Sequence, residues 1–218
     1  MPYEIGGRAD KLGNKYEFNW IVLKFIDIIA EKIDAIKIEP IGPEADRVDV
    51  LVRYRNGSKE AQQCKGRNAS KENWSLADLN QRGILNSWRR HLERDPQVKV
   101  SLVSPLPFIS FSDLIYRAKT NDDDQYFIEY QVQTSSVISS LLNDYIKYLG
   151  FSKEKDIRKV IDFLSRTVIR QEPYPDNEEF IKDKVSQYFI GDATSIKSKF
   201  INLILQGEIY GRWLSFQD

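Results

Sequence analysis

An Asn-Gly dipeptide at positions 56 and 57 constrains the fold more than any other feature of the chain. Two strand-like runs, Val48–Tyr54 and Lys59–Lys65, flank it. Asn-Gly between two such runs is the strongest short-range signal for a β-hairpin. Because side chains alternate between the two faces of a strand, Gln63 and Lys65 point to the same face. The segment therefore predicts a hairpin that ends in two polar groups on one face.

The elements around this hairpin predict an α/β fold. A helix from about Asn14 to Lys32 carries an apolar stripe, and a strand at Ala35–Ile41 alternates isoleucines with charged residues. After the hairpin, the pattern predicts a helix over Leu76–Arg94 and a buried strand over Val98–Val103. This order of helix, three strands, helix and strand predicts a mixed central sheet flanked by helices.

The rest of the chain predicts helices alone. Their expected ranges are Asp113–Lys119, Ser136–Tyr148, Lys153–Thr167, Asn177–Ile190 and Ser195–Phe216. A Pro-containing stretch, Ser104-Pro105-Leu106-Pro107, separates them from the first part. We therefore expect residues 1–107 to form the core domain and residues 108–218 to form a mainly helical C-terminal extension.

Composition narrows the class of protein. With 218 residues, 41% hydrophobic and 29% charged, the chain is long enough for a sizeable core and reads as soluble and globular. Its formal net charge of zero means that binding to nucleic acid requires a local basic patch. The single cysteine, Cys64, excludes an internal disulfide and a cysteine-based zinc site. The first residues do not resemble a signal peptide, so we expect a cytoplasmic protein with no membrane partner.

Four polar side chains on or near the hairpin suit the hydrolysis of a phosphodiester. That reaction requires ligands for a metal that acidifies a water molecule, and a cation for the developing negative charge. Asp49 lies in an otherwise apolar strand, where a carboxylate is costly unless it is paired or bound to a metal. Glu17 and the amide oxygen of Gln63 complete the candidate ligand set, which suits Mg²⁺, with Mn²⁺ as the alternative. Lys65 is the candidate for orienting the water or stabilising the transition state.

The order Glu17, Asp49 and Gln63-x-Lys65, followed by a helix and a strand, resembles the PD-(D/E)XK restriction-endonuclease-like nucleases. Gln63 stands where the family pattern has Asp or Glu. A Gln-x-Lys version of the pattern occurs in Mrr-like and related branches of the family. The opening GGRADKLGNKYE and the run QQCKGRN are similar to the N-terminal effector nucleases of bacterial antiphage proteins of the STAND (Avs-like) and Cap types. The resemblance covers roughly residues 6–104. It implies a restriction-endonuclease-like fold and a metal-dependent endonuclease that cuts double-stranded DNA with little sequence preference in antiphage defence.

The resemblance also implies partners. Such nucleases act on double-stranded DNA as homo-oligomers, and they are joined to an NTPase or a nucleotide-sensing domain. The chain has no Walker GxxxxGK[ST] motif, so we expect any NTPase or sensor to lie in another domain or subunit. Basic residues that follow the candidate site are our candidates for contacts with DNA phosphates: Arg67, Lys71, Arg82, Arg89 and Arg90.

Two alternatives to an active enzyme stay open at the level of sequence. The first is a catalytically degenerate nuclease fold that still binds DNA, in which Gln63 marks the loss of catalysis. The second is an adaptor whose helical half docks a partner. An active enzyme requires Asp49, Gln63 and Lys65 to converge on one point, so the three-dimensional arrangement discriminates among these readings.

Overall fold

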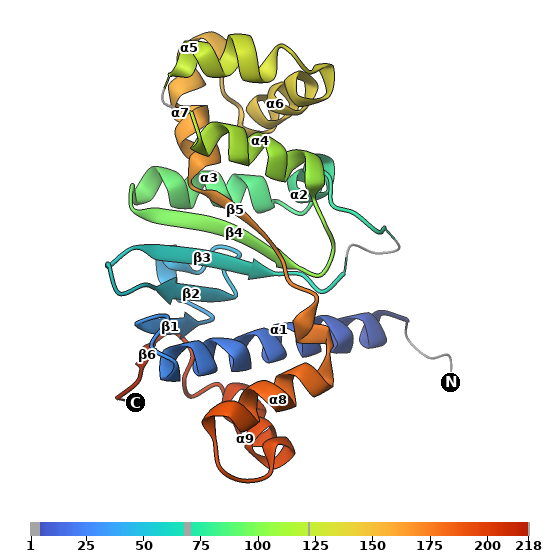
Figure 1. Cartoon of the computed structure of the whole chain (residues 1–218), viewed down its shortest axis with the longest axis vertical. Coiled ribbons are helices and arrows are strands. Elements are labelled where there is room, and N and C mark those ends of the chain that lie inside the picture. Colours follow the sequence, from blue (N-terminus) through green and yellow to red (C-terminus); the bar gives the residue numbers. More distant parts are fainter. Residues whose placement is uncertain (1–4, 68–70, 122, 218) are drawn as a thin grey trace.

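A six-stranded sheet forms the centre of the molecule, in the order β5-β4-β3-β2-β1-β6 (Figure 1). The computed structural model describes residues 5–67, 71–121 and 123–217, with side chains from residue 15 onward. The strands are β1 (Ala35–Ile38), β2 (Val50–Arg53), β3 (Lys59–Cys64), β4 (Val98–Ser104), β5 (Thr167–Gln171) and β6 (Trp213–Ser215). β3, β4 and β5 are parallel neighbours, whereas β6, β1, β2 and β3 pair antiparallel. The predicted α/β fold with a mixed sheet is confirmed.

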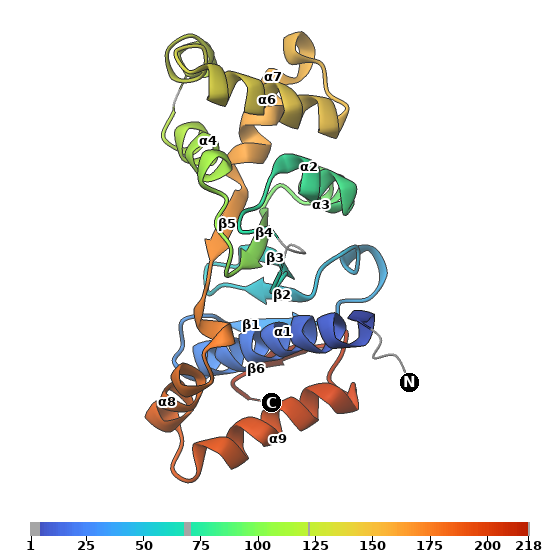
Figure 2. The ribbon, with the colours of Figure 1, turned by 90° about the vertical axis from the view of Figure 1, so that its right-hand side faces the viewer.

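Helices gather at both ends of this sheet (Figures 1 and 2). α1, α8 and α9 lie beside β1 and β6, and α4, α6 and α7 lie beyond β4 and β5. The helices are α1 (Ile5–Ile29), α2 (Leu76–Gln81), α3 (Ile84–Arg94), α4 (Ile109–Lys119), α5 (Asp124–Tyr126) with its π-helical continuation Phe127–Val132, α6 (Ser136–Leu149), α7 (Lys153–Ser165), α8 (Glu178–Tyr188) and α9 (Ala193–Gln206). No helix in the described residues is long and apolar enough to cross a membrane.

The predicted hairpin is confirmed as β2 and β3. The Tyr54 N–H donates to the Ser58 carbonyl at 2.9 Å, and the Gly57 N–H donates to the Tyr54 carbonyl at 2.9 Å. Gly57 has a φ of 81°, a left-handed conformation that glycine adopts without steric cost. A tight turn followed by a left-handed glycine matches the right-handed twist of the paired strands.

The structure corrects three of the predicted element boundaries. α1 begins at Ile5, in a segment that the sequence predicted as a loop before Asn14. The predicted helix over residues 76–94 is two helices, because Gly83 between them has a left-handed φ of 69°. The predicted helix to Phe216 stops at Gln206, where Gly207 caps it in the left-handed conformation.

Two strands were not predicted, and both follow residue 108. β5 pairs with β4, and β6 pairs with β1. The sheet therefore extends across the predicted boundary between residues 107 and 108. The division of the chain into a core domain, residues 1–107, and a C-terminal extension, residues 108–218, stays a prediction.

Gly83 gives the first testable prediction. A Cβ atom at Gly83 would lie 3.0 Å from Nη2 of Arg47, whereas a Cβ at Gly57 would meet nothing within 4 Å. Both glycines have positive φ, so an alanine is strained at either position. Only Gly83→Ala also adds a close contact, which the matched control Gly57→Ala lacks. We expect Gly83→Ala to lower the free energy of unfolding by about 1–2 kcal/mol and to exceed the effect of Gly57→Ala. Urea denaturation of both variants measures this difference, and equal losses would contradict it.

Each face of the sheet covers its own hydrophobic core. Ala61, Val100 and Leu102 pack with α2, α3, α4, α6 and α7. Val50 and Cys64 pack with α1, α8 and α9 on the other side. Cys64 is a free, buried cysteine, as its strand position predicted. Successive residues of β3 therefore point into two different cores, which is the alternation expected of a strand.

A buried polar network links three strands on the α1 side of the sheet. Arg170 of β5 donates to both carboxylate oxygens of Glu60, from Nε at 2.7 Å and from Nη2 at 2.6 Å. The Tyr54 hydroxyl donates to Glu60 at 2.6 Å, and Gln62 joins Glu60 to the indole N–H of Trp20 in α1. The network therefore connects β2, β3, β5 and α1 through one carboxylate that is 1% exposed.

The Glu60 network predicts a stability that depends on pH. Burial raises the pKa of Glu60, but the hydrogen bonds and charge of Arg170 and the Tyr54 hydroxyl outweigh it and lower the pKa from 4.5 to about 2. A group whose pKa is lower in the folded state stabilises that state above its unfolded pKa and stops doing so as it is protonated. We expect about 3 kcal/mol of stability to be lost between pH 4.5 and pH 2. Urea denaturation across this range tests it, and Glu60→Gln should flatten the dependence.

Candidate functional site

Asp49 and Lys65 meet at the end of the β2–β3 hairpin. Asp49 directly precedes β2, and its Oδ2 accepts a hydrogen bond of 2.6 Å from the backbone N–H of Cys64. Lys65 directly follows β3, and its Nζ lies 3.6 Å from the same Oδ2 of Asp49. The Lys65 ammonium also donates to the Cys64 carbonyl at 2.9 Å. The carboxylate and the ammonium are thus positioned by backbone groups at a strand end.

Gln63 lies in β3 next to the residue that faces Asp49. The Asp49 N–H donates to the Gln62 carbonyl at 3.0 Å, so Asp49 lies opposite Gln62 across the hairpin. The Gln63 side chain is 4% exposed, and its Oε1 is buried without a hydrogen-bond partner. A buried amide oxygen without a partner is costly, and its presence calls for an explanation such as a ligand or an ion. The fold therefore brings Asp49 and Lys65 together, whereas convergence of the Gln63 side chain with these two groups stays a prediction.

Two further carboxylates act on the same region. Glu17 is half-buried on α1; its burial and the charges of Asp49 and Glu39 raise its pKa to about 8, against the opposing charge of Lys65. Burial raises the pKa of Asp49, which the Lys65 charge and the Cys64 N–H oppose. Glu39 directly follows β1, and its N–H donates to the Asp49 carbonyl at 3.0 Å. Burial is the largest cause of each raised pKa, and the charge of Asp49 adds to it at Glu17 and Glu39.

The donor atoms fit a divalent cation that prefers oxygen. Asp49 and Glu17 supply carboxylates, and Gln63 supplies an amide oxygen that has no other partner. Within the described residues, no three side chains among His, Cys, Asp and Glu lie close enough to form a metal site by themselves. Mg²⁺ keeps several of its water ligands and requires only one or two carboxylates, so it is the candidate ion for such a donor set.

The predicted DNA-binding residues lie in the segment that follows β3 and in α3: Arg67, Lys71, Arg82, Arg89 and Arg90. At least four of them are engaged within the described part of the chain. Lys71 pairs with Asp78, Arg90 pairs with Asp46, and Arg89 binds Glu93 and the carbonyl at the end of α6. Arg67 is exposed, and the Arg82 guanidinium lies 5.3 Å from the centre of the Trp74 ring. A role for these residues in binding DNA stays a prediction.

The sequence analysis did not identify two residues near Asp49 as candidates for the site. Glu39 is the residue that follows β1, and the pairing of Ile38 with Val50 places it next to Asp49. Arg47 precedes Asp49 by two residues and has a left-handed φ of 53°. The strand boundary after Ile38 was the available signal for Glu39, whereas no sequence pattern distinguishes Arg47 from other loop arginines.

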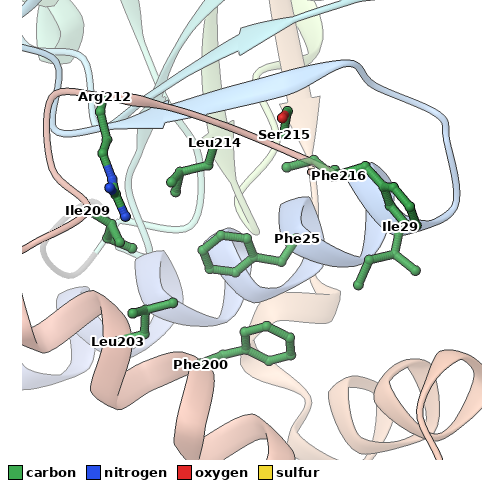
Figure 3. A pocket seen from close by; sticks show the side chains of 10 residues that line it. Phe25, Ile29, Phe200, Leu203, Ile209, Arg212, Leu214, Ser215 and Phe216 are labelled. Atoms are coloured by element: carbon green, nitrogen blue, oxygen red, sulfur yellow. The ribbon is translucent and has the colours of Figure 1, made fainter. Parts of the chain in front are cut away.

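An apolar pocket lies elsewhere, between α1, α9 and β6 (Figure 3). It encloses about 340 Å³ and is lined mainly by aromatic and aliphatic side chains, among them Phe25, Phe200, Ile209 and Leu214. None of the predicted catalytic residues lines it. Its walls suit apolar groups, so the polar end of the hairpin is the better candidate for phosphodiester chemistry.

Comparison with known proteins shows a similar fold in one class of receptor. No protein-family model matches the chain, and no curated protein matches it. Among solved structures, the fold is similar to that of receptors containing a SAVED/CARF domain. The Cap4 receptor of Moraxella osloensis aligns with 91% of this chain at 14% identity and a TM-score of 0.51. The Cap4 receptor of Acinetobacter baumannii aligns with 89% of this chain at 13% identity and a TM-score of 0.52.

The chain spans less than half the length of these receptors, 44% in Moraxella osloensis and 42% in Acinetobacter baumannii. Another structure of the Acinetobacter baumannii receptor was determined with the cyclic trinucleotide 3′3′3′-cAAA. It aligns with 89% of this chain and 43% of that one, at 13% identity and a TM-score of 0.52. At such low identity the similarity shows the fold alone.

Proposed function

We propose that the chain is a metal-dependent endonuclease domain that hydrolyses phosphodiester bonds of double-stranded DNA. The observation that carries this proposal is the meeting of Asp49 and Lys65 at the end of the hairpin; the buried, unpaired amide oxygen of Gln63 on the same strand supports it. The sequence resemblance to restriction-endonuclease-like nucleases assigns catalytic roles to the same residues. The direct test is incubation of the chain with a DNA duplex in MgCl₂ and, in parallel, in EDTA. Cleavage only with Mg²⁺ supports the proposal.

Each residue has a distinct role in the proposed reaction. Asp49, Gln63 and Glu17 would hold Mg²⁺, which supplies a polarised phosphoryl oxygen and a more acidic water molecule. The Cys64 N–H fixes the orientation of the Asp49 carboxylate. Lys65 carries its positive charge at the same point and stabilises the negative charge that develops on the phosphoryl group.

We place this activity in antiphage defence, in the cytoplasm. The similarity to Cap4 receptors supports that setting, and so does the resemblance of the opening segment and the QQCKGRN run to antiphage effector nucleases. One of the similar structures contains a cyclic trinucleotide, which supports control of the nuclease by a nucleotide-sensing domain or subunit. Two or more copies of the nuclease would then face one duplex in the active state.

A DNA-binding module without catalysis is the second candidate. It is favoured by Gln63 in the place of an acid and by the lack, among described residues, of three metal-ligating side chains in one group. In that case the chain would bind duplex DNA with equal affinity in MgCl₂ and EDTA, and Mg²⁺ would not raise its melting temperature. These two measurements distinguish the candidates.

The Gln63→Glu substitution tests the metal site without relying on activity. A carboxylate binds Mg²⁺ more tightly than an amide oxygen, but it adds a negative charge next to Asp49 when no metal is bound. In EDTA we expect Gln63→Glu to be about 1–3 kcal/mol less stable than wild type and to melt at a lower temperature. We also expect added MgCl₂ to raise the melting temperature of Gln63→Glu more than that of wild type. Thermal melting of both proteins measures this, with the exposed α8 substitution Gln187→Glu as the matched control. A melting temperature that Mg²⁺ leaves unchanged in both proteins would contradict the assignment.

A further inference from the structure

Arg47 adopts a backbone conformation that few residues other than glycine adopt. Its φ is 53°, and left-handed residues of this kind cost about 1 kcal/mol or more. The turn is fixed by its neighbour Asp46, whose carbonyl lies 3.0 Å from Nε2 of His91 in α3. Ser87 of α3 donates to the same carbonyl. The fold therefore maintains a strained conformation two residues before Asp49, and such strain clusters at functional sites.

The Arg47 guanidinium lies flat against Gly83. A Cβ atom at Gly83 would be 3.0 Å from Nη2, 3.1 Å from Nε and 3.2 Å from Cζ of Arg47, so the plane of the group faces the glycine. Within the described part of the chain, Arg47 makes no hydrogen bond or ion pair, and its side chain is exposed. One face of the guanidinium is packed while its N–H donors remain available, which is the state of a cation ready to bind an anion.

Arg47 is also close enough to Asp49 to act on the same DNA strand. Two residues span at most about 7 Å of chain. A DNA strand carries one phosphate for about each 3.4 Å of helix axis. A strand with one phosphate at Asp49 therefore has a neighbouring phosphate within reach of the Arg47 side chain.

The local charge balance requires such a cation. The Lys65 ammonium lies 3.6 Å from Oδ2 of Asp49, so its charge is shared with that carboxylate. Two of the arginines predicted to bind DNA are paired with acids: Arg89 with Glu93, and Arg90 with Asp46, the residue directly before Arg47. We propose that Arg47 binds the backbone phosphate next to the scissile one, a role that rests on the proposed function.

The test measures binding of a fluorescein-labelled DNA duplex to the full chain by fluorescence polarisation in EDTA, over a series of salt concentrations. We expect Arg47→Ala to weaken binding about 5- to 10-fold and to reduce the slope of log K against log salt by about 1. Arg47→Lys should retain most of the affinity, because it keeps the charge. The matched control is Arg55→Ala, an exposed arginine at the hairpin tip that pairs with Glu31.

Arg47→Gly separates the charge from the backbone. It removes the guanidinium but relieves the left-handed strain, so it should bind DNA as weakly as Arg47→Ala while being at least as stable as wild type. If wild type binds or cuts DNA and both variants bind with wild-type affinity and salt dependence, the role of Arg47 is refuted and the proposed function stands. A wild-type chain that neither binds nor cuts the duplex refutes both.

Discussion

Replacing Asp49 with alanine is expected to abolish DNA cleavage, with a loss of roughly 10³-fold or more in rate. Oδ2 of Asp49 lies 3.6 Å from Nζ of Lys65, so the change removes the proposed main metal ligand and the anchor of the lysine. Asp49→Asn keeps a group that accepts the Cys64 N–H and should be equally inactive, because it lacks the charge. The measurement is the rate at which supercoiled plasmid is converted to nicked and linear forms in MgCl₂.

Matched controls for this prediction lie at the other end of the same strands. Asp34, directly before β1, pairs with Arg53 at the far end of β2, and Asp34→Ala should cleave like wild type. Lys59 is the first residue of β3, and Lys65 directly follows its last residue. Lys59→Ala is therefore the control for Lys65→Ala, whose cleavage rate we expect to fall about 10²- to 10³-fold. Cleavage by folded Asp49→Ala at the wild-type rate would refute the proposed catalytic site.

Replacing Glu60 with alanine is expected to cost about 3–5 kcal/mol of stability. The substitution leaves the guanidinium of Arg170 without its carboxylate in a largely buried setting and removes the partner of the Tyr54 hydroxyl. A buried charge that loses its partner is far more costly than the pair was favourable. Urea denaturation measures the change in the free energy of unfolding.

The exposed pair between Arg55 and Glu31 provides the comparison. Glu31→Ala removes an ion pair of 2.6 Å whose side chains are 60% and 68% exposed, so it should cost less than about 1 kcal/mol. The double variant Glu60→Leu/Arg170→Met should recover much of the loss, because it leaves no unpaired charge. A cost for Glu60→Ala as small as that for Glu31→Ala would show that the network does not stabilise the fold.

Local patterns predicted the elements that carry the site. The Asn-Gly turn predicted the hairpin, and the apolar stripe through Ile21 and Phe25 predicted the helix that bears Glu17. The run from Val98 predicted a strand buried on both faces, which β4 is. These predictions held because turn chemistry and hydrophobic periodicity act over a few residues.

The errors arose where distant contacts decide the structure. β5 and β6 are short strands that form by pairing with β4 and β1, which precede them by many residues. Thr167, Val168 and Ile169 have high β-propensity, a signal that the neighbouring helical pattern obscured.

The sequence by itself determined the polar groups at the end of the hairpin, since the alternation of a strand places Gln63 and Lys65 on one side. Only the tertiary structure decided how those groups behave. Packing of α1 against the sheet brings Glu17 to Asp49 and buries both, which raises their pKa values. Burial likewise leaves the amide oxygen of Gln63 without a partner. The physical reason is that desolvation and charge interaction depend on which segments meet in space, and a hairpin pattern contains no information about them.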